Sequence, residues 1–304
     1  MITSCFFIPV ANGDLQRVHW TVQSIRKFCN NYRIYLLLDI KPGIVLNQTI
    51  PGDDVEILYP QSPSNRHWGT ILRMQCSAML QALSLPDISH DCIFVKMDAD
   101  ALLIRQSFVK RAQTLFSENP KCGQLGQVFK NISGMPLTNA GWARYFQRRM
   151  SLVGHAKAFG LFLRHSKRPY QSLKYALRLR NLLLEATRNG YRPGTFAIGG
   201  AYILRRQTVL DIQKRGWLDD SPFFLWPYPG EDVMLTPHIY AIGYTAMDDV
   251  EEDGLFAICG KESWIHPLEL ARKGYYFIHP TKYGVTKFLP KMSEIDLVQA
   301  LLSM

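Results

Sequence analysis

The sequence predicts an α/β protein with a central, mostly parallel sheet and flanking helices. Apolar, β-branched runs of strand length alternate along the chain with segments in which apolar residues recur at helical spacing. The predicted strands are apolar at nearly every position, as expected for a sheet that helices cover on both faces. With 304 residues, the chain is long enough for one large domain or two small ones.

Strands and helices alternate regularly through the first hundred residues. Apolar runs predict four strands, at 2–10, 33–39, 55–59 and 92–104. Apolar residues at helical spacing predict helices at 15–25 and 65–85. Asp14 stands where the side chain that caps the first helix is expected, and Pro86 closes the second helix. This order of elements is typical of parallel strands.

The second half of the chain has more widely spaced elements. They are a strand after Gly199-Gly200, a helix around Val209 to Ile212, a helix from Glu231, a strand that ends on His279 and a helix at 291–304. Residues 217–230 are rich in Gly and Pro and predict a long loop. Long loops in compact domains are often functional.

The composition excludes several classes of protein. Hydrophobic residues make up 47% of the chain and charged residues 20%, as in ordinary soluble globular proteins. No apolar run approaches the ~20 residues of a membrane-spanning helix. The N-terminal residues lack the basic start and the cleavage site of a signal peptide. The six cysteines show no C-x-x-C spacing, so we expect reduced thiols, no zinc site and a cytoplasmic protein.

The net charge of +10 is concentrated in one segment. From Arg144 to Arg192, Lys and Arg recur throughout while Glu185 is the single acidic residue. A helix at 170–184 mixes leucines with these cations. The favoured interpretation is that the leucines pack on the core; the alternative is a peripheral contact of 144–192 with an anionic membrane. No nucleic-acid-binding motif is present, so no nucleic-acid partner is expected. The acidic residues at 248–253 lack calcium-loop spacing and predict a solvated loop.

Two carboxylates, those of Asp98 and Asp100, interrupt the predicted strand 92–104. Alternate residues of a strand point to the same side, so these carboxylates can converge at the carboxyl end of the strand, where open α/β sheets bind ligands. Divalent cations prefer oxygen ligands and leave positions open for phosphates, so the pair fits a metal–diphosphate site. Two alternatives remain: a strand that simply exits into solvent, and a haloacid-dehalogenase-type phosphatase with Asp98 as nucleophile. The phosphatase motif, however, continues with Gly or Thr and usually follows the first strand of the fold, whereas the pair here lies in the fourth predicted strand.

Three later groups each have an ordinary structural explanation when taken alone. Gly199-Gly200 permit a close approach of a ligand to the backbone, and equally a bend. Glu231-Asp232 open a helix, where the helix dipole favours acids. His279 ends an apolar strand, with Lys282 three positions later.

The order of these groups resembles the GT-A glycosyltransferases, and among them most closely the fringe and β-1,3-glycosyltransferase type. The matching motifs are D-x-D at 98–100, G-G-A-Y-I-L at 199–204, G-E-D-V at 230–233 and the strand-end His279. The resemblance implies a GT-A (Rossmann-like) fold with a mixed, mostly parallel sheet in a single catalytic domain over 1–304. Its parts would be a nucleotide-sugar-binding half at 1–130, a basic helical insert at 141–192, an acceptor-binding half at 193–290 and a C-terminal helix at 291–304. The basic insert has no counterpart that aligns with the family, and we expect no membrane anchor such as the secretory-pathway members have.

The resemblance also implies a donor site. A metal ion, Mn²⁺ or Mg²⁺, would be held by Asp98, Asp100 and His279. The nucleotide-sugar donor, expected to be a UDP-sugar, would be bound by Pro9, Val10, Asp39, Arg66 or Arg73, Gly199, Gly200 and Lys282. For either arginine, a solvated helix face is the more ordinary explanation. The metal would neutralise charge on the leaving nucleoside diphosphate.

The same resemblance implies that Asp232 is the general base that deprotonates the acceptor hydroxyl, with Glu231 as the second choice. A single base opposite the leaving group gives inversion, and such a base contributes ~10²–10⁴-fold. The acceptor is expected to be a glycan, a lipid-linked sugar or a small molecule. Three alternatives remain: a retaining GT-A transferase in which Asp232 positions the substrate, the phosphatase, and a non-catalytic nucleotide- or glycan-binding protein.

Overall fold

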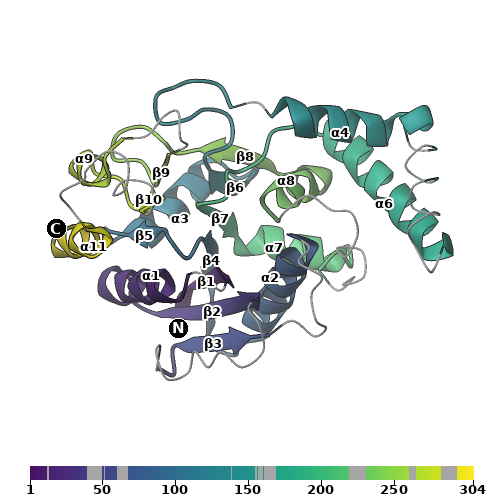
Figure 1. Cartoon of the computed structure of the whole chain (residues 1–304). Helices are drawn as coiled ribbons and strands as arrows, with labels where there is room; N and C mark the ends of the chain where they lie inside the picture. Colours follow the sequence, from purple (N-terminus) through teal and green to yellow (C-terminus); the bar gives the residue numbers. More distant parts are fainter. Residues whose placement is uncertain are drawn as a thin grey trace.

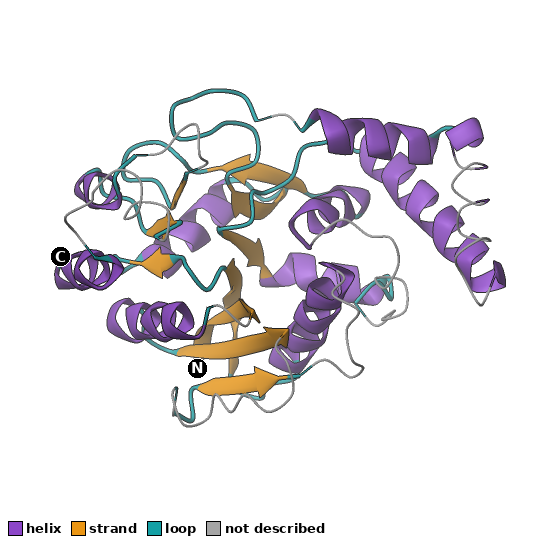
Figure 2. Ribbon diagram, in the orientation of Figure 1, coloured by secondary structure: helices purple, strands orange, loops and turns teal. Residues whose placement is uncertain are grey.

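Seven strands form one sheet at the centre of the molecule (Figure 1, Figure 2). The computed structural model describes residues 1–11, 14–39, 50, 52–59, 68–137, 139–154, 156, 160, 169–218, 231–259, 265–281 and 293–304. In spatial order the strands are β3 (Val55–Leu58), β2 (Tyr32–Asp39), β1 (Ile2–Ala11), β4 (Ile88–Met97), β7 (Ala201–Arg205), β6 (Cys122–Gly126) and β8 (Thr245–Asp248).

The sheet is mostly parallel, as the sequence predicts. The pairs β1–β2, β2–β3, β1–β4 and β6–β8 are parallel. Strand β7 runs antiparallel to both of its neighbours, β4 and β6. The carboxyl ends of β1, β2 and β4 therefore lie at one edge of the sheet, which is the edge where open α/β sheets bind ligands. The predicted fold class, a mixed α/β protein with flanking helices, is confirmed.

A second, small sheet lies beside this edge and completes the architecture. It has three strands in the order β5 (Leu102–Leu103), β10 (Phe277–His279) and β9 (Phe256–Ile258). Strand β10 is antiparallel to β5 and parallel to β9. Helices α9 (Pro267–Arg272) and α11 (Glu294–Ser303) pack on it through buried Leu270, Leu297 and Leu301.

Helices cover both faces of the central sheet because alternate strand residues point to opposite sides. On one face, the ring of Phe7 stacks between those of Tyr35 and Phe94 at centroid distances of 5.4 and 5.6 Å. The helices of that core are α2 (Trp68–Leu83), α4 (Ala140–Met150), α6 (Pro169–Arg188), α7 (Arg206–Lys214) and α8 (Glu231–Ala241). The opposite core contains Phe6 and Ile8, with helices α1 (Leu15–Phe28) and α3 (Phe108–Glu118).

Two local predictions in the first half of the chain need correction. Asp14 occupies the N-cap position of α1, but its side chain makes no capping hydrogen bond and instead lies 3.4 Å from Arg17. The single strand predicted at 92–104 is two strands in different sheets, because β4 ends at Met97 and residues 98–101 form a turn before β5. All six cysteines are buried free thiols, as predicted.

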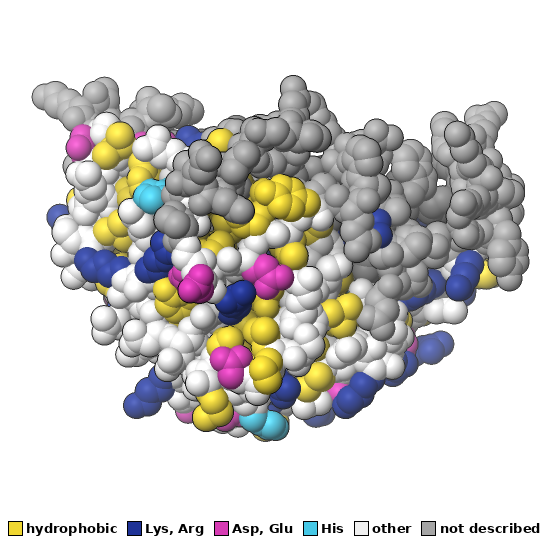
Figure 3. Space-filling model, turned by 90° about the horizontal axis from the view of Figure 1, so that it is seen from below, with side chains coloured by type: hydrophobic (Ala, Val, Ile, Leu, Met, Phe, Trp, Pro, Cys, Tyr) yellow, Lys and Arg dark blue, Asp and Glu magenta, His cyan; other side chains and the backbone are white. Residues whose placement is uncertain are grey.

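The helices α4 and α6 form a pair that extends from one side of the sheet (Figure 1). Leu179, Leu182 and Leu183 of α6 are buried in the core with α8, as the favoured interpretation of this segment predicts, whereas Leu177 is 43% exposed. Figure 3 shows Lys and Arg side chains along the side of the molecule where α4 and α6 lie. Among the helices that the structure describes, none is long and apolar enough to cross a membrane. The peripheral membrane contact stays a prediction.

The prediction of a solvated loop at 248–253 is wrong for Asp248 and Asp249 and right for the exposed residues 251–253. The Asp248 carboxylate accepts hydrogen bonds from the backbone N–H groups of Val128, Phe129 and Lys130. The Asp249 carboxylate accepts two hydrogen bonds of 2.8 Å from the guanidinium of Arg111. Both carboxylates therefore hold neighbouring segments together. Sequence spacing could not reveal these partners because they lie more than a hundred residues away along the chain.

Acidification is expected to destabilise the protein through His238 of α8. The ring is buried, its Nδ1 lies 2.7 Å from the carbonyl of Met234, and burial lowers its pKa from 6.5 to about 4. The unfolded chain binds a proton near pH 6.5 and the folded chain does not. The contribution of the neutral His238 ring to folding stability is therefore fully present above pH 6.5 and is lost as the pH falls toward 4. Urea unfolding should show a loss of about 2 kcal/mol between pH 7.5 and pH 5 that is absent in His238→Phe. The same change at exposed His90 is the control; an equal pH dependence in His238→Phe and wild type would contradict the assignment.

Candidate metal and donor site

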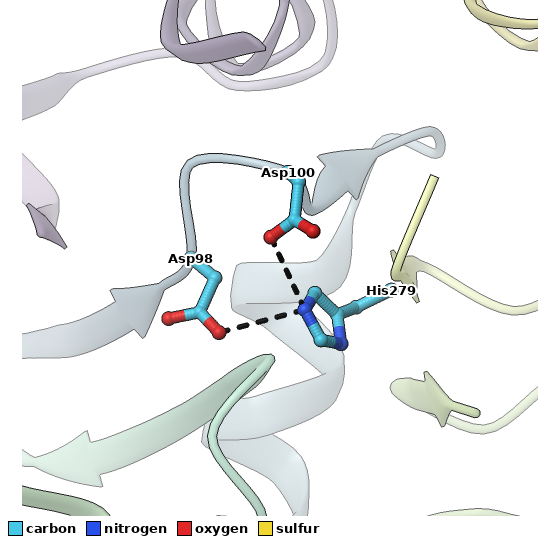
Figure 4. Close-up of side chains that lie close together, drawn as sticks. All are labelled: Asp98, Asp100 and His279. Carbon is cyan, nitrogen blue, oxygen red and sulfur yellow. Dashed lines mark ion pairs between the residues drawn. The ribbon is translucent and has the colours of Figure 1, made fainter. Parts of the chain in front are cut away.

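Three side chains that could hold a metal ion converge beside the carboxyl end of β4 (Figure 4). The Nε2 atom of His279 lies 3.5 Å from Oδ2 of Asp98 and 3.2 Å from Oδ1 of Asp100. One donor atom of each residue lies within 4.8 Å of the other two. Asp98 and His279 are half-buried, whereas Asp100 is buried. The grouping that the sequence predicts is thus present, although the three residues come from positions 98, 100 and 279 of the chain.

The backbone around the two carboxylates is held from several directions. The N–H group of Ala101 donates to the carbonyl of Asp98, which closes the turn. Thr21 of α1 donates its hydroxyl to the carbonyls of Ala99 and Ala101, at 2.8 Å each. Thr281, two residues after His279, donates both its N–H and its hydroxyl to the carbonyl of Asp100. The turn is therefore fixed to α1 and to the end of β10, as preorganised ligand binding requires.

The convergence of the two carboxylates has a different cause from the one that the sequence suggests. Asp98 and Asp100 do not occupy alternate positions of a strand, because the strand ends at Met97. They lie in the turn between β4 and β5, and His279 reaches them from β10, the central strand of the small sheet. The two sheets meet here, so the site lies at their junction.

Gly199 and Gly200 make room for two of the site's side chains. A Cβ atom on Gly200 would lie 2.6 Å from Cγ and from Nδ1 of the His279 ring, and one on Gly199 would lie 2.2 Å from Oδ2 of Asp232. Both distances are far below van der Waals contact. The carbonyl of Gly200 also accepts a hydrogen bond of 2.8 Å from the N–H group of Asp98. The glycine pair therefore lets His279 and Asp232 lie directly against the backbone.

Gly200→Ala is expected to displace His279 and to weaken divalent-metal binding. The added methyl group overlaps the ring at its stem, which cannot swing away as a flexible chain end would. A Mn²⁺ affinity at least ~10-fold weaker than in wild type, measured by the EPR signal of free Mn²⁺, is expected. Gly160→Ala is the matched control because no atom of the described residues lies within 4 Å of the added atom there. Unchanged Mn²⁺ affinity in a folded Gly200→Ala protein would show that His279 is not a ligand.

A lysine that the sequence analysis did not single out lies at the centre of this site. Lys96 of β4 has a side chain that is 1% exposed. Its Nζ atom lies 2.6 Å from Oδ1 of Asp98 and 3.2 Å from Oδ1 of Asp232. The signal was available: a lysine inside an apolar strand, two positions before Asp98 and on the face that α2 and α8 cover. Asp232 opens α8, and its pairing with Lys96 brings it into the site.

The ligand atoms of Asp98, Asp100 and His279 fit a small divalent cation. Ligands at right angles around Mg²⁺ or Mn²⁺, with bonds of about 2.1 Å, lie about 3 Å apart, and the two histidine–carboxylate distances of 3.2 and 3.5 Å are close to this. Carboxylates suit Mg²⁺ and Mn²⁺ alike, and an imidazole ligand favours Mn²⁺ over Mg²⁺. Among the described residues of the site, Asp98, Asp100 and Asp232 set three carboxylates against the ammonium of Lys96, and a divalent cation would balance these charges.

The other residues predicted to bind the nucleotide-sugar donor fall into two groups, those that the structure describes and those that it does not. Val10 and Asp39 lie one step apart in register at the ends of β1 and β2, on the same edge of the sheet as Asp98. The side chain of Val10 is buried in the core, so it can offer a ligand only its backbone; Pro9 is half-buried. Arg73 is half-buried on α2. Outside the described residues lie Arg66, Lys282, the side chains of Asp39 and Glu231, and the predicted loop from 219 to 230.

Comparison with known proteins gives only distant likenesses. No protein-family model matches the sequence, and no curated protein matches it. A mannosyltransferase from Pyrobaculum calidifontis, PcManGT, in complex with GDP-Man and Mn²⁺, is similar over 86% of this chain and 58% of its own, at 12% identity and a TM-score of 0.41. The galactosyltransferase LgtC, in complex with donor and acceptor sugar analogues, is similar over 99% and 96%, at 10% identity and a TM-score of 0.41.

Residues 1–349 of S. aureus TarS are similar over 46% of this chain and 40% of that one, at 13% identity and a TM-score of 0.33. This chain therefore spans little more than half the length of the mannosyltransferase and less than half of the TarS fragment. At these identities and TM-scores the three proteins assign neither a family nor a function to this chain, and the geometry of the site has to support the functional inference.

Proposed function

We propose that this protein is a metal-dependent glycosyltransferase of the GT-A type, which moves a sugar from a nucleoside-diphosphate sugar to an acceptor hydroxyl. The observation that carries the proposal is the convergence of Asp98, Asp100 and His279 beside the carboxyl ends of parallel strands. A third carboxylate, that of Asp232, is joined to this cluster through Lys96. The ordered motifs of the sequence support the same function.

Each part of the site has a role in this reaction. Asp98, Asp100 and His279 would hold Mn²⁺ or Mg²⁺, which supplies Lewis-acid stabilisation of the charge on the leaving diphosphate. The ends of β1 and β2, with Pro9, Val10 and Asp39, would bind the base and ribose, and a UDP-sugar is the proposed donor. Arg73 and Lys282 are proposed phosphate or sugar contacts. The donor would be bound by the 1–130 half and the acceptor by the 193–290 half.

Asp232 is the proposed general base, with inversion at the anomeric carbon. Its carboxylate is 25% exposed, so one part of it can meet an acceptor hydroxyl at the site. The alternative is a retaining transferase in which Asp232 positions the substrate. The observation that favours this alternative is the ion pair of Asp232 Oδ1 with Lys96, since a carboxylate held by a buried ammonium is well suited to positioning.

The phosphatase alternative requires Asp98 to attack a phosphate as a nucleophile. In the structure, Oδ1 of Asp98 receives a 2.6 Å hydrogen bond from Lys96, and Oδ2 faces His279. Both contacts suit a metal ligand, and the products of turnover separate this role from that of a nucleophile. A non-catalytic nucleotide- or glycan-binding protein would share the metal site and is separated from the enzyme by turnover.

A panel of nucleotide sugars tests the proposal. The wild-type protein is incubated with each sugar nucleotide and Mn²⁺ or EDTA; nucleoside diphosphate release and the thermal shift are followed. A donor that binds the native state raises the unfolding temperature by mass action. We expect one donor class, UDP-sugars, to give Mn²⁺-dependent release. Release of phosphate from phosphomonoesters would point to the phosphatase, and binding without turnover to the non-catalytic protein.

A further inference from the structure

The buried ammonium group of Lys96 joins two carboxylates of different proposed function. It lies 2.6 Å from Asp98, a proposed metal ligand, and 3.2 Å from Asp232, the proposed base. Its side chain is 1% exposed, and its Nζ atom lies 5.8 Å from the centre of the Tyr202 ring. Burying an ammonium at this depth costs hydration that charged partners have to compensate. The two carboxylates described beside Lys96 belong to the site, which ties Lys96 to its function.

The walls around Lys96 fix where the ammonium can lie. Tyr202 of β7 stands beside Lys96 in the antiparallel pair of β4 and β7. The phenol oxygen of Tyr202 lies 2.9 Å from Nε2 of Gln75 on α2, so the ring is held in place. Lys96 thus reaches its two carboxylates from a rigid strand and past a fixed aromatic wall.

We propose that Lys96 is a positioning residue that sets the metal selectivity of the site by leaving Asp98 only one oxygen for the cation. The inference rests on the proposed function, because it concerns the same metal site. Lys96 holds Oδ1 of Asp98, and Oδ2 is the oxygen that faces His279. Asp98 can therefore coordinate a cation through Oδ2 alone while the ion pair persists.

One-oxygen coordination discriminates between cations. Mg²⁺ and Mn²⁺ accept six ligands in an octahedral arrangement, and a carboxylate commonly gives them one oxygen. Ca²⁺ takes six to eight oxygens at longer distances and often binds both oxygens of a carboxylate. By occupying Oδ1, Lys96 removes the second oxygen that Ca²⁺ would use. The site is thereby biased toward the smaller cations.

The same contact couples the metal site to Asp232. The ammonium holds Oδ1 of Asp232, and Oδ2 of Asp232 lies where a side chain at Gly199 would have to be. Lys96 and the backbone at Gly199 therefore fix this carboxylate from two sides. A change at Lys96 should disturb both the cation preference and the placement of Asp232, whereas a change at Asp232 should leave the one-oxygen coordination by Asp98 intact.

Lys96→Met tests the proposal because it keeps the chain length and removes the ammonium. The EPR signal of free Mn²⁺ gives the Mn²⁺ affinity, and competition by Ca²⁺ gives the Ca²⁺ affinity. We expect the ratio of Mn²⁺ to Ca²⁺ affinity to fall by ~10-fold or more in Lys96→Met, in the range typical of residues that orient a metal ligand. Lys110→Met, the same change at an exposed lysine of α3, should leave the ratio unchanged.

Each outcome of this experiment decides a separate point. A wild-type protein that binds no Mn²⁺ would contradict the proposed metal site itself. A wild-type protein that binds Mn²⁺, with an unchanged ratio in folded Lys96→Met, would overturn only the role of Lys96. Loss of all divalent binding in the variant would overturn it as well, since Lys96 would then be needed for binding and not for selectivity. If Lys96→Met does not fold, the double variant Lys96→Met with Asp232→Asn is used instead. It also removes the charge of one carboxylate that the ammonium pairs with, and the same affinity ratio is measured.

Discussion

Replacing Asp98 with Asn is expected to abolish metal-dependent release of nucleoside diphosphate. The substitution keeps the shape of the side chain but replaces a charged metal ligand, Oδ2, by a neutral amide atom. It also removes the negative charge that Lys96 pairs with at 2.6 Å. Substitutions that only orient a metal ligand cost ~10–100-fold in metal affinity, so the loss of a ligand should cost more than that range.

The effect of Asp98→Asn is measured as Mn²⁺ affinity and as Mn²⁺-dependent turnover of the donor found in the panel. Asp91→Asn is the matched control, because Asp91 lies on the same strand β4 with a side chain that is 77% exposed. Circular dichroism establishes that both variants are folded. Turnover in Asp98→Asn that equals the control and still depends on Mn²⁺ would rule out Asp98 as a ligand.

Replacing Asp232 with Asn is expected to lower sugar transfer by ~10²–10⁴-fold, the contribution of a positioned general base. The amide keeps the size of the carboxylate against Gly199 but cannot accept the proton of the acceptor hydroxyl. Mn²⁺ affinity should stay close to that of wild type, because Asp232 is not among the three clustered ligands. A loss in kcat with an unchanged donor KM would therefore separate Asp232 from the metal ligands.

The stereochemistry of the product decides between the two mechanisms for Asp232. NMR of the first-formed product should show a β-linkage from an α-linked nucleotide sugar if Asp232 is the base. An α-linked product, with residual transfer in Asp232→Asn, would instead assign Asp232 to substrate positioning. Glu231→Gln is the companion variant, since Glu231 precedes Asp232 at the start of α8 and is the second choice for the base.

Much of the fold follows from hydrophobic patterning alone. The first four strands and the helices between them are visible because each is a buried run or an amphipathic repeat of sufficient length. The small sheet was not visible, since β5 and β9 have only two and three residues and are defined by their pairing with β10. The split of the predicted strand 92–104 could not be seen for a related reason. The residues after the turn are as apolar as those before it, because they are buried in the core of the small sheet.

The clustering of the proposed metal ligands could be predicted, whereas the interactions that support them could not. Asp98, Asp100 and His279 are of residue types that bind metals, and their positions at strand ends mark them. The ion pair of Lys96 with Asp232, by contrast, depends on α8 returning to β4 after more than a hundred residues. The one sign of this interaction in the sequence is a lysine within an apolar strand. The role of Gly200 is also a three-dimensional property, because the ring that fills its missing side chain belongs to a strand far along the chain.

We propose that Asp98, Asp100 and His279 together hold one divalent cation on a donor diphosphate. The most direct measurement is a Mn²⁺ titration of the wild-type protein by EPR, with and without UDP, beside His279→Ala. We expect one tight Mn²⁺ per chain, bound more tightly when UDP is present, and a marked loss of both effects in His279→Ala. Binding of Mn²⁺ and UDP that is the same in wild type and in His279→Ala would contradict it.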